Sequence, residues 1–241
     1  MPKIFLLDGE LKIGSRVIKD EKARYLSTVL RCYVGDFLLI KDNGGNAYLS
    51  RITHVTKREV TVDILEKQNF DPEPPIRMTL LQGLLKGEKM DLVIQKATEL
   101  GVNEIIPVVT ERSQIRETRR LMRWKKIAEE ASRQSGRNTI PTVCEPLDIA
   151  RLFITLKSPQ GGIIFWEQKT SALHDTIERF RGTNEITLFT GPEGGFSRGE
   201  IEIASQRGFI AASLGKRILR AETATIAAIS IIQYELGNFG I

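Results

Sequence analysis

The sequence predicts two domains, a small β-rich domain followed by an α/β domain with a largely parallel sheet. Three observations predict this class. Up to about residue 70, short apolar runs alternate with turns. The segment QNFDPEPP at residues 68–75 then has three prolines and no periodicity, which is typical of a linker. After it, strand and helix patterns alternate, as in sheets covered by helices on both faces. We place the boundary near residue 72, which gives domains 1–72 and 73–241.

The first domain is predicted from three apolar segments. Residues 37–40 form the first, the turn DNGGN at 42–46 follows, and residues 47–55 form the second. Residues 60–65 alternate valine and isoleucine with polar residues and form the third. The sequence therefore predicts a compact β domain.

The second domain begins with a buried strand at residues 78–85 and a helix at 88–100. That helix has apolar residues at helical spacing and is closed by Gly101. Strands are predicted at 105–109, 162–166 and 186–190, with a short strand leading into Leu214. Helices are predicted around 123–134 and at 198–207 and 223–236.

The last of these helices is apolar on nearly every side. Two interpretations remain open. The helix lies in the centre of the core, or it is shared between the core and a subunit interface.

Composition excludes several classes of protein. The chain has 241 residues and a formal charge of +5, from 35 Lys and Arg against 30 Asp and Glu, which permits an anionic partner without requiring one. No apolar run is long enough for a membrane span, and the first residues turn acidic too soon for a signal peptide, so we expect a cytoplasmic protein. The two cysteines lie far apart and only two histidines are present, which disfavours a disulfide framework or a metal site.

Two segments are candidates for chemistry because each lies where a predicted strand ends and a helix begins. They are TGPEGGFS at residues 190–197 and LGKRILRAETA at 214–224. In parallel α/β sheets, ligands bind in the crevice beyond the carboxyl ends of the strands. Glycine lets the backbone approach a flat ligand closely. The alternative is that these segments are ordinary glycine-rich turns.

Standard nucleotide-binding and hydrolase motifs are missing from the sequence. Residues 83–90, GLLKGEKM, lack the spacing and the hydroxyl of a Walker loop. No G-x-G-x-x-G follows a strand, and neither histidine lies near a nucleophile elbow. Kinases, dinucleotide enzymes and Ser-His-Asp hydrolases are therefore disfavoured.

Basic residues gather around the predicted helix at 123–134. A solvated helix face is the usual explanation of such a cluster, but arginine predominates here, and guanidinium groups suit contacts with phosphates and bases. We therefore favour phosphate binding by this cluster. The cluster comprises Arg112, Arg116, Arg119, Arg120, Arg123, Lys125, Lys126, Arg133 and Arg137.

Several motifs together resemble the RsmE family, the SPOUT-class methyltransferases of small-subunit ribosomal RNA. The matching stretches run in the family's order through the whole second domain. They are GEKM at 87–90, IQK at 94–96, ELGV at 99–102, Gln134 with GRN at 136–138 and Pro141, GPEGGFS at 191–197, and LGKRILRAETA at 214–224. In the first domain, residues 29–31 and 35–36 also fit, but Arg24 and Tyr25 stand where such proteins often have histidines.

The resemblance implies a PUA-like β-barrel domain followed by a SPOUT α/β domain with a C-terminal trefoil knot. It also implies a homodimer that methylates N3 of a uridine in 16S ribosomal RNA with S-adenosylmethionine. We expect the cofactor to contact Thr190, Gly191, Glu193, Gly194, Gly195, Leu214, Gly215, Ile218, Leu219, Arg220, Thr223 and Ala224. We expect RNA to contact Lys22, Arg24, Arg31, Arg133 and Arg137.

The expected reaction assigns roles to three residues. As the N3 proton leaves uracil, negative charge spreads onto the flanking carbonyl oxygens, and Arg217 and Arg220 are the candidates that stabilise it. Glu222 orients an arginine, accepts a proton, or only caps the last helix. Glu193 has the same ambiguity. The alternative function is a non-catalytic RNA-binding factor in ribosome assembly, in which the glycine loops are structural. A metabolic enzyme acting on a free nucleotide would leave the basic β domain without a purpose.

Overall fold

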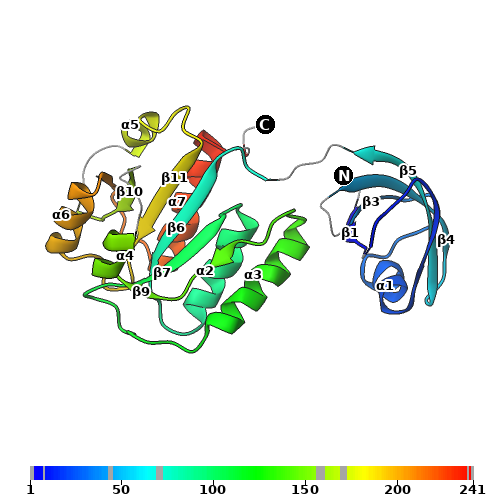
Figure 1. Cartoon of the computed structure of the whole chain (residues 1–241), viewed down its shortest axis with the longest axis horizontal. Helices are drawn as coiled ribbons and strands as arrows, with labels where there is room; N and C mark the ends of the chain where they lie inside the picture. Colours follow the sequence, from blue (N-terminus) through cyan, green and yellow to red (C-terminus); the bar gives the residue numbers. More distant parts are fainter. Residues whose placement is uncertain are drawn as a thin grey trace. The chain divides into compact units, whose positions relative to one another are not determined.

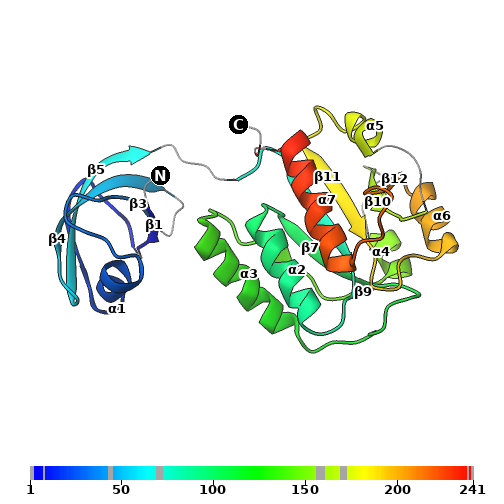
Figure 2. The same cartoon turned by 180° about the vertical axis from the view of Figure 1, so that it is seen from behind.

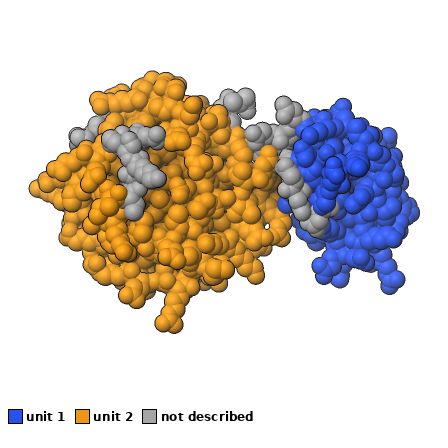
Figure 3. All heavy atoms as spheres, viewed as in Figure 1, with its two compact units in different colours: residues 1–72 blue, residues 73–241 orange. Residues whose placement is uncertain are grey.

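The computed structural model describes residues 3–7, 9–42, 46–68, 73–155, 161–168, 173–237 and 239. The chain divides into two compact units, residues 1–72 and 73–241 (Figure 3). Within the expected linker, residues 69–72 lie outside the described residues, as do residues 43–45 of the expected turn.

Unit 1 is a curled five-stranded sheet in the order β1-β3-β4-β5-β2 (Figure 1). β1 is parallel to β3 and the other pairings are antiparallel. The inward side chains, such as Leu38, Ile52 and Val62, are almost fully buried. The three strands expected from the sequence are confirmed as β3, β4 and β5. The elements are β1 (Lys3–Leu6), β2 (Gly14–Lys19), α1 (Asp20–Arg24), the π-helical turn η1 (Tyr25–Val29), β3 (Phe37–Lys41), β4 (Ala47–Val55) and β5 (Glu59–Gln68).

Unit 2 is an α/β unit whose described strands form one sheet in the order β12-β10-β11-β6-β7-β8, with β9 also paired to β7. Every pairing in this sheet is parallel, which confirms the expected topology. Its strands are β6 (Arg77–Gly83), β7 (Glu104–Val109), β8 (Thr142–Val143), β9 (Leu147–Asp148), β10 (Gly162–Phe165), β11 (Glu185–Thr190) and β12 (Phe209–Ala212). Its helices are α2 (Glu88–Glu99), α3 (Leu121–Ser135), α4 (Ile149–Thr155), α5 (Leu173–Glu178), α6 (Arg198–Gln206) and α7 (Ala221–Glu235).

Helices cover both faces of this sheet (Figures 1 and 2). On one face, α2, α3 and α7 pack around a core that includes Met90, Trp124 and Ile229. On the other face, α4 and α6 enclose an aromatic cluster that includes Phe153 and Phe189. The apolar helix predicted at 223–236 is α7, which packs against α2 and β11.

The end of α2 illustrates how local sequence fixes an element. Met90, Val93, Ile94 and Ala97 recur at helical spacing and are fully buried. Gly101 then has φ +88, a left-handed conformation that favours glycine and ends the helix. The helix predicted at 88–100 is therefore confirmed.

The strand order brings three strand ends together. β10 lies between β11 and β12, although the chain visits β10 first. Because the three strands are parallel, the segments that follow them emerge at the same edge of the sheet. This edge carries the candidate site. The trefoil knot stays a prediction.

Candidate functional site

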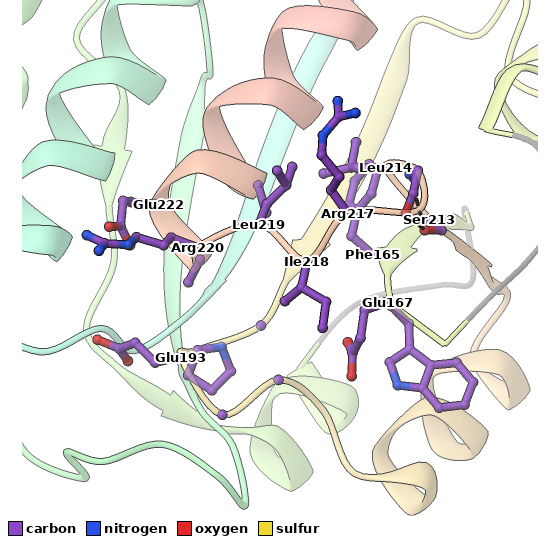
Figure 4. Close-up of a pocket in the computed structure, with 18 of the residues that line it drawn as sticks. Phe165, Glu167, Glu193, Ser213, Leu214, Arg217, Ile218, Leu219, Arg220 and Glu222 are labelled. Carbon is purple, nitrogen blue, oxygen red and sulfur yellow. Dashed lines mark hydrogen bonds between the residues drawn. The ribbon is translucent and has the colours of Figure 1, made fainter.

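A cavity of about 480 Å³ lies at this edge, within the range of small-molecule sites (Figure 4). Its walls come from the end of β10, the loop after β11, the segment after β12 and the first turn of α7. The lining residues are Lys89, Phe165, Trp166, Glu167, Gly191, Pro192, Glu193, Gly194, Gly195, Ser213, Leu214, Gly215, Arg217, Ile218, Leu219, Arg220, Ala221, Glu222 and Ala224.

The loop after β11 needs glycine at two places. A Cβ on Gly194 would come within 2.9 Å of the Arg112 carbonyl oxygen and 2.8 Å of Arg112 Cβ. Gly195 has φ +67 and lies against the Glu167 carboxylate. Ser197 is the N-cap of α6, where its side chain and that of Glu200 form a reciprocal capping box. The loop is therefore closely held at its end and backed by the Arg112 segment.

The segment after β12 presents its side chains openly. Gly215 has φ +114, and Ile218 is 87% exposed although it lines the cavity. Arg217 and Arg220 are exposed, and Arg220 precedes α7 with extended backbone. In Figure 4 the Arg220 side chain extends towards Glu222, whereas Arg217 extends in another direction. Two cationic groups thus reach different parts of one cavity.

Glu193 is tied to the beginning of α2. Its Oε1 accepts hydrogen bonds from Lys89 Nζ at 3.0 Å and from the Lys86 backbone amide at 3.3 Å. Burial works to raise the pKa of Glu193. The hydrogen bonds from its own backbone amide, from Lys89 and from Lys86 outweigh burial and hold the pKa below its ordinary value. The carboxylate is therefore ionised at neutral pH.

Three buried polar atoms in the lining have no hydrogen-bond partner among the described residues. They are Glu193 Oε2, Glu222 Oε2 and Trp166 Nε1. Buried polar atoms are normally paired, so such atoms in a cavity indicate where a ligand's polar groups fit. The two carboxylate oxygens suit a cationic or N–H donor, and the indole N–H suits an acceptor.

The structure brings most of the expected site residues together. Of the expected cofactor contacts, Thr190 and Thr223 do not line the cavity. Thr190 is buried and hydrogen bonded to Gln82, and Thr223 is exposed on α7. The expected catalytic residues Arg217, Arg220 and Glu222 all line it. Sequence reasoning missed Lys89, Phe165, Trp166, Glu167, Pro192, Ser213 and Ala221 as lining residues. Trp166 and Glu167 lie at the end of the strand predicted at 162–166, so the rule that ligands bind beyond the carboxyl ends of parallel strands could have indicated them.

Arg137 differs from its expected role in RNA binding because the folded chain encloses it. Its guanidinium makes an ion pair with Glu73 at 2.6 Å and donates to the carbonyl oxygens of Thr98 and Val102. Only 3% of its side chain is exposed. The structure thus encloses Arg137 within unit 2, whereas the expected RNA contact called for an exposed side chain.

The other expected RNA contacts lie nearer the surface. Arg24 and Arg31 are exposed on unit 1, and Lys22 is half-buried there. Arg133 is exposed on α3, where it pairs with Glu129 at 3.2 Å. In the wider cluster, Arg123 is paired with Asp91 at 2.8 Å.

In the described part of the chain, no helix is long and apolar enough to cross a membrane. Nor do its histidine, cysteine, aspartate and glutamate side chains form a group of three or more that could hold a metal ion.

The two units match two protein families in chain order. Residues 18–65 match the RNA methyltransferase PUA domain, and residues 72–233 match the RNA methyltransferase domain. The fold and the cavity at its strand ends therefore define an RNA methyltransferase with a PUA domain.

Individual relatives show which family of RNA methyltransferases the chain belongs to. The ribosomal RNA small subunit methyltransferase E of Buchnera aphidicola subsp. Acyrthosiphon pisum is 31% identical over 99% of this chain and 95% of its own length. The protein of that name from Bacillus subtilis is 30% identical over 90% of this chain and 89% of its own. The chain belongs to the family of ribosomal RNA small subunit methyltransferase E.

Solved structures agree with this assignment. The Neisseria gonorrhoeae member, bound to S-adenosyl methionine, has a TM-score of 0.76 and 35% identity over 99% of this chain and 100% of its own. A putative methyltransferase from Legionella pneumophila, in complex with the same cofactor, has a TM-score of 0.74 and 31% identity over 99% and 100%.

Proposed function

We propose that this protein methylates N3 of a specific uridine in 16S ribosomal RNA, with S-adenosylmethionine as methyl donor. The observation that carries the proposal is the cavity of about 480 Å³ at three strand ends. The two segments that resemble the family's motifs, 191–197 and 214–224, supply most of its wall. Relatives that are 31–35% identical over nearly the whole chain bind this cofactor.

The residues of the cavity fit the cofactor chemically. The glycine loop at 191–195 and the segment 214–219 would hold the adenosine portion with backbone groups. The unpartnered carboxylate oxygens of Glu193 and Glu222 suit the cofactor's positive charge, and the free indole N–H of Trp166 suits an acceptor. When bound, S-adenosylmethionine supplies an electrophilic methyl group.

The chain's own residues activate the uracil. Arg217 and Arg220 lie in the cavity wall, and one or both would face the uracil carbonyl oxygens, where negative charge develops as the N3 proton leaves. Glu222 would accept that proton or orient Arg220, towards which it lies in Figure 4. Arg220 gives the N-terminus of α7 no side-chain capping hydrogen bond, and the positive end of the helix dipole there favours negative charge at this part of the cavity.

RNA binding is assigned to both units. Unit 1 would use Lys22, Arg24 and Arg31. Unit 2 would use Arg133 and the exposed arginines of the cluster. Among these, Arg112 lies beside the glycine loop at 191–195, because it donates to the carbonyl oxygen of Gly194 at 3.3 Å. RNA held by this segment would lie near the methyl group. We further propose a homodimer, a knotted C-terminal segment and a cytoplasmic location, where ribosomal subunits are assembled.

Two measurements test the function. Isothermal calorimetry should show S-adenosylmethionine binding, which a non-catalytic assembly factor would lack. Mass spectrometry of ribosomal RNA from cells without the protein should show one uridine that has lost its N3 methyl group, and the purified protein should restore it in vitro. Intact methylation in those cells would refute the proposed substrate.

A further inference from the structure

The end of β6 lies beneath the cavity and takes no part in its lining. Gln82 is the penultimate residue of this strand and is fully buried. It pairs in register with Thr190, the last residue of β11. A polar side chain with no exposure must find partners for both its carbonyl oxygen and its amide N–H groups.

Three of the four partners of Gln82 lie in or directly beside the two segments that build most of the cavity, and the fourth is its neighbour Gly83. Its Oε1 accepts from Thr190 Oγ1 at 2.8 Å and from Thr225 Oγ1 at 2.7 Å. Its Nε2 donates to the carbonyl oxygens of Gly83 at 3.0 Å and Gly191 at 3.4 Å. Since carbonyl oxygens only accept, these partners fix the orientation of the amide group. One side chain thus joins the start of the glycine loop to the first turns of α7.

Backbone packing at the next residue has the same effect. A Cβ on Gly83 would collide with the backbone nitrogen of Pro192 and with the carbonyl carbon of Gly191. The glycine loop therefore rests directly on the backbone at the end of β6. Because Gly191 and Pro192 line the cavity, a displacement at Gln82 would change the shape of its wall.

We propose that Gln82 is a positioning residue for cofactor binding, which fixes the loop at 191–195 relative to α7 through Thr190, Gly191 and Thr225. The inference rests on the proposed function, because both take S-adenosylmethionine to be the ligand of this cavity. Gln82 touches neither the cavity nor the reacting atoms, so its effect reaches the ligand only through the two segments.

Gln82→Met tests the proposal, because methionine has nearly the same shape and makes none of the four hydrogen bonds. The Kd for S-adenosylmethionine should rise by about tenfold or more, because the loop at 191–195 would lose the buried hydrogen bonds through which Gln82 holds it relative to α7. The KM for the cofactor should rise with it, and the rate at saturating cofactor should change less.

The matched control is Gln233→Met. Gln233 is also fully buried in unit 2 and donates to the Leu100 carbonyl oxygen at 2.8 Å, but it lies near the other end of α7 and is not among the residues that line the cavity. This variant should lose stability and keep its Kd for the cofactor. Equal Kd values for the unchanged chain, Gln82→Met and Gln233→Met would overturn the proposal. A failure of the proposed function would look different, because the unchanged chain itself would not bind the cofactor.

A second variant covers the case in which Gln82→Met does not fold. A protonated glutamic acid has one O–H donor and an acceptor oxygen, so Gln82→Glu can replace the amide only when protonated. Burial raises the pKa of such a carboxyl group. Cofactor binding by Gln82→Glu, relative to the unchanged chain, should therefore recover as the pH falls. A relative affinity that stays the same at every pH would contradict the positioning role.

Discussion

At the scale of single residues, Arg137 shows how a charged side chain can serve the fold. Its guanidinium joins Glu73 at the start of unit 2 to the carbonyl oxygens of Thr98 and Val102, where α2 ends. Replacing Arg137 by Ala would remove the ion-pair partner of the largely buried Glu73 carboxylate, which would keep the backbone N–H bonds from Asn138 and Thr139, and this loss costs roughly 3–5 kcal/mol. Thermal or denaturant unfolding should show this loss. Arg133→Ala, at an exposed ion pair, should change the free energy of unfolding by less than about 0.5 kcal/mol.

The same pair predicts a dependence on pH. Burial works to raise the pKa of Glu73, but the hydrogen bonds and charge of Arg137 and the bonds from Thr139 outweigh it, so the pKa is lowered. A lowered pKa in the folded state contributes stability above the ordinary pKa of glutamate, and this stability is lost as the pH falls through the lowered value. The difference in unfolding free energy between the unchanged chain and Glu73→Gln should therefore shrink in acid. A difference that stays constant down to acid pH would contradict the lowered pKa.

Arg220 is the residue on which the proposed chemistry depends most. If its guanidinium stabilises charge on the uracil oxygens, Arg220→Ala should lower the single-turnover rate of methyl transfer at saturating RNA by roughly two orders of magnitude. RNA affinity should change much less. A variant that loses only RNA affinity and keeps the transfer rate would make Arg220 a positioning residue.

At the scale of elements, the glycine loop depends on close packing against the Arg112 segment. A side chain on Gly194 would meet the Arg112 backbone carbonyl, which cannot move aside as a flexible side-chain tip can. Gly194→Val should therefore abolish cofactor binding, and circular dichroism should show an intact fold. Gly199→Val is the matched control, because a Cβ there meets nothing within 4 Å. Normal cofactor affinity in a folded Gly194→Val protein would refute this account of the loop.

Helices and strands with a clear repeat of apolar residues were predictable from the sequence, and elements without such a repeat were not. The sequence predicts α2 and α7 to within two residues at each end, because many apolar side chains repeat in them. The edge strand β2 was missed because five of its six residues are exposed, so it lacks an apolar pattern. The short helices α4 and α5 were missed too, since they span only seven and six residues.

The site was predictable only where glycine marks it. Both loops were expected from their glycines, but Trp166 and Glu167 join them because β10 lies between β11 and β12, an order that no local pattern specifies. The burial of Arg137 was unpredictable for a similar reason. Its partner Glu73 lies 64 residues earlier in the chain, and only the fold brings them together.

At the scale of the whole molecule, the two units should contribute separately to binding. If Arg31 of unit 1 contacts a phosphate, Arg31→Ala should weaken RNA binding and reduce the slope of log affinity against log salt by about one. Its affinity for S-adenosylmethionine should stay unchanged, since the described cavity lies wholly in unit 2. If the slope of log affinity against log salt does not change, Arg31 does not contact an RNA phosphate.

The last prediction at this scale is that the protein forms a dimer, with an apolar face of α7 at the interface between subunits. One face of this helix packs in the core through Ala228, Ile229 and Ile232. On another face Ala227 is only partly buried and Tyr234 is 65% exposed, and the partly buried Ile231 between them also packs against the edge of the core. An apolar surface on a helix that already supplies the core is typical of an interface between subunits. Sedimentation at micromolar concentration should therefore show a dimer, and Tyr234→Asp should shift it towards the monomer by placing a charge on this face. A monomeric, fully active unchanged chain would contradict the prediction.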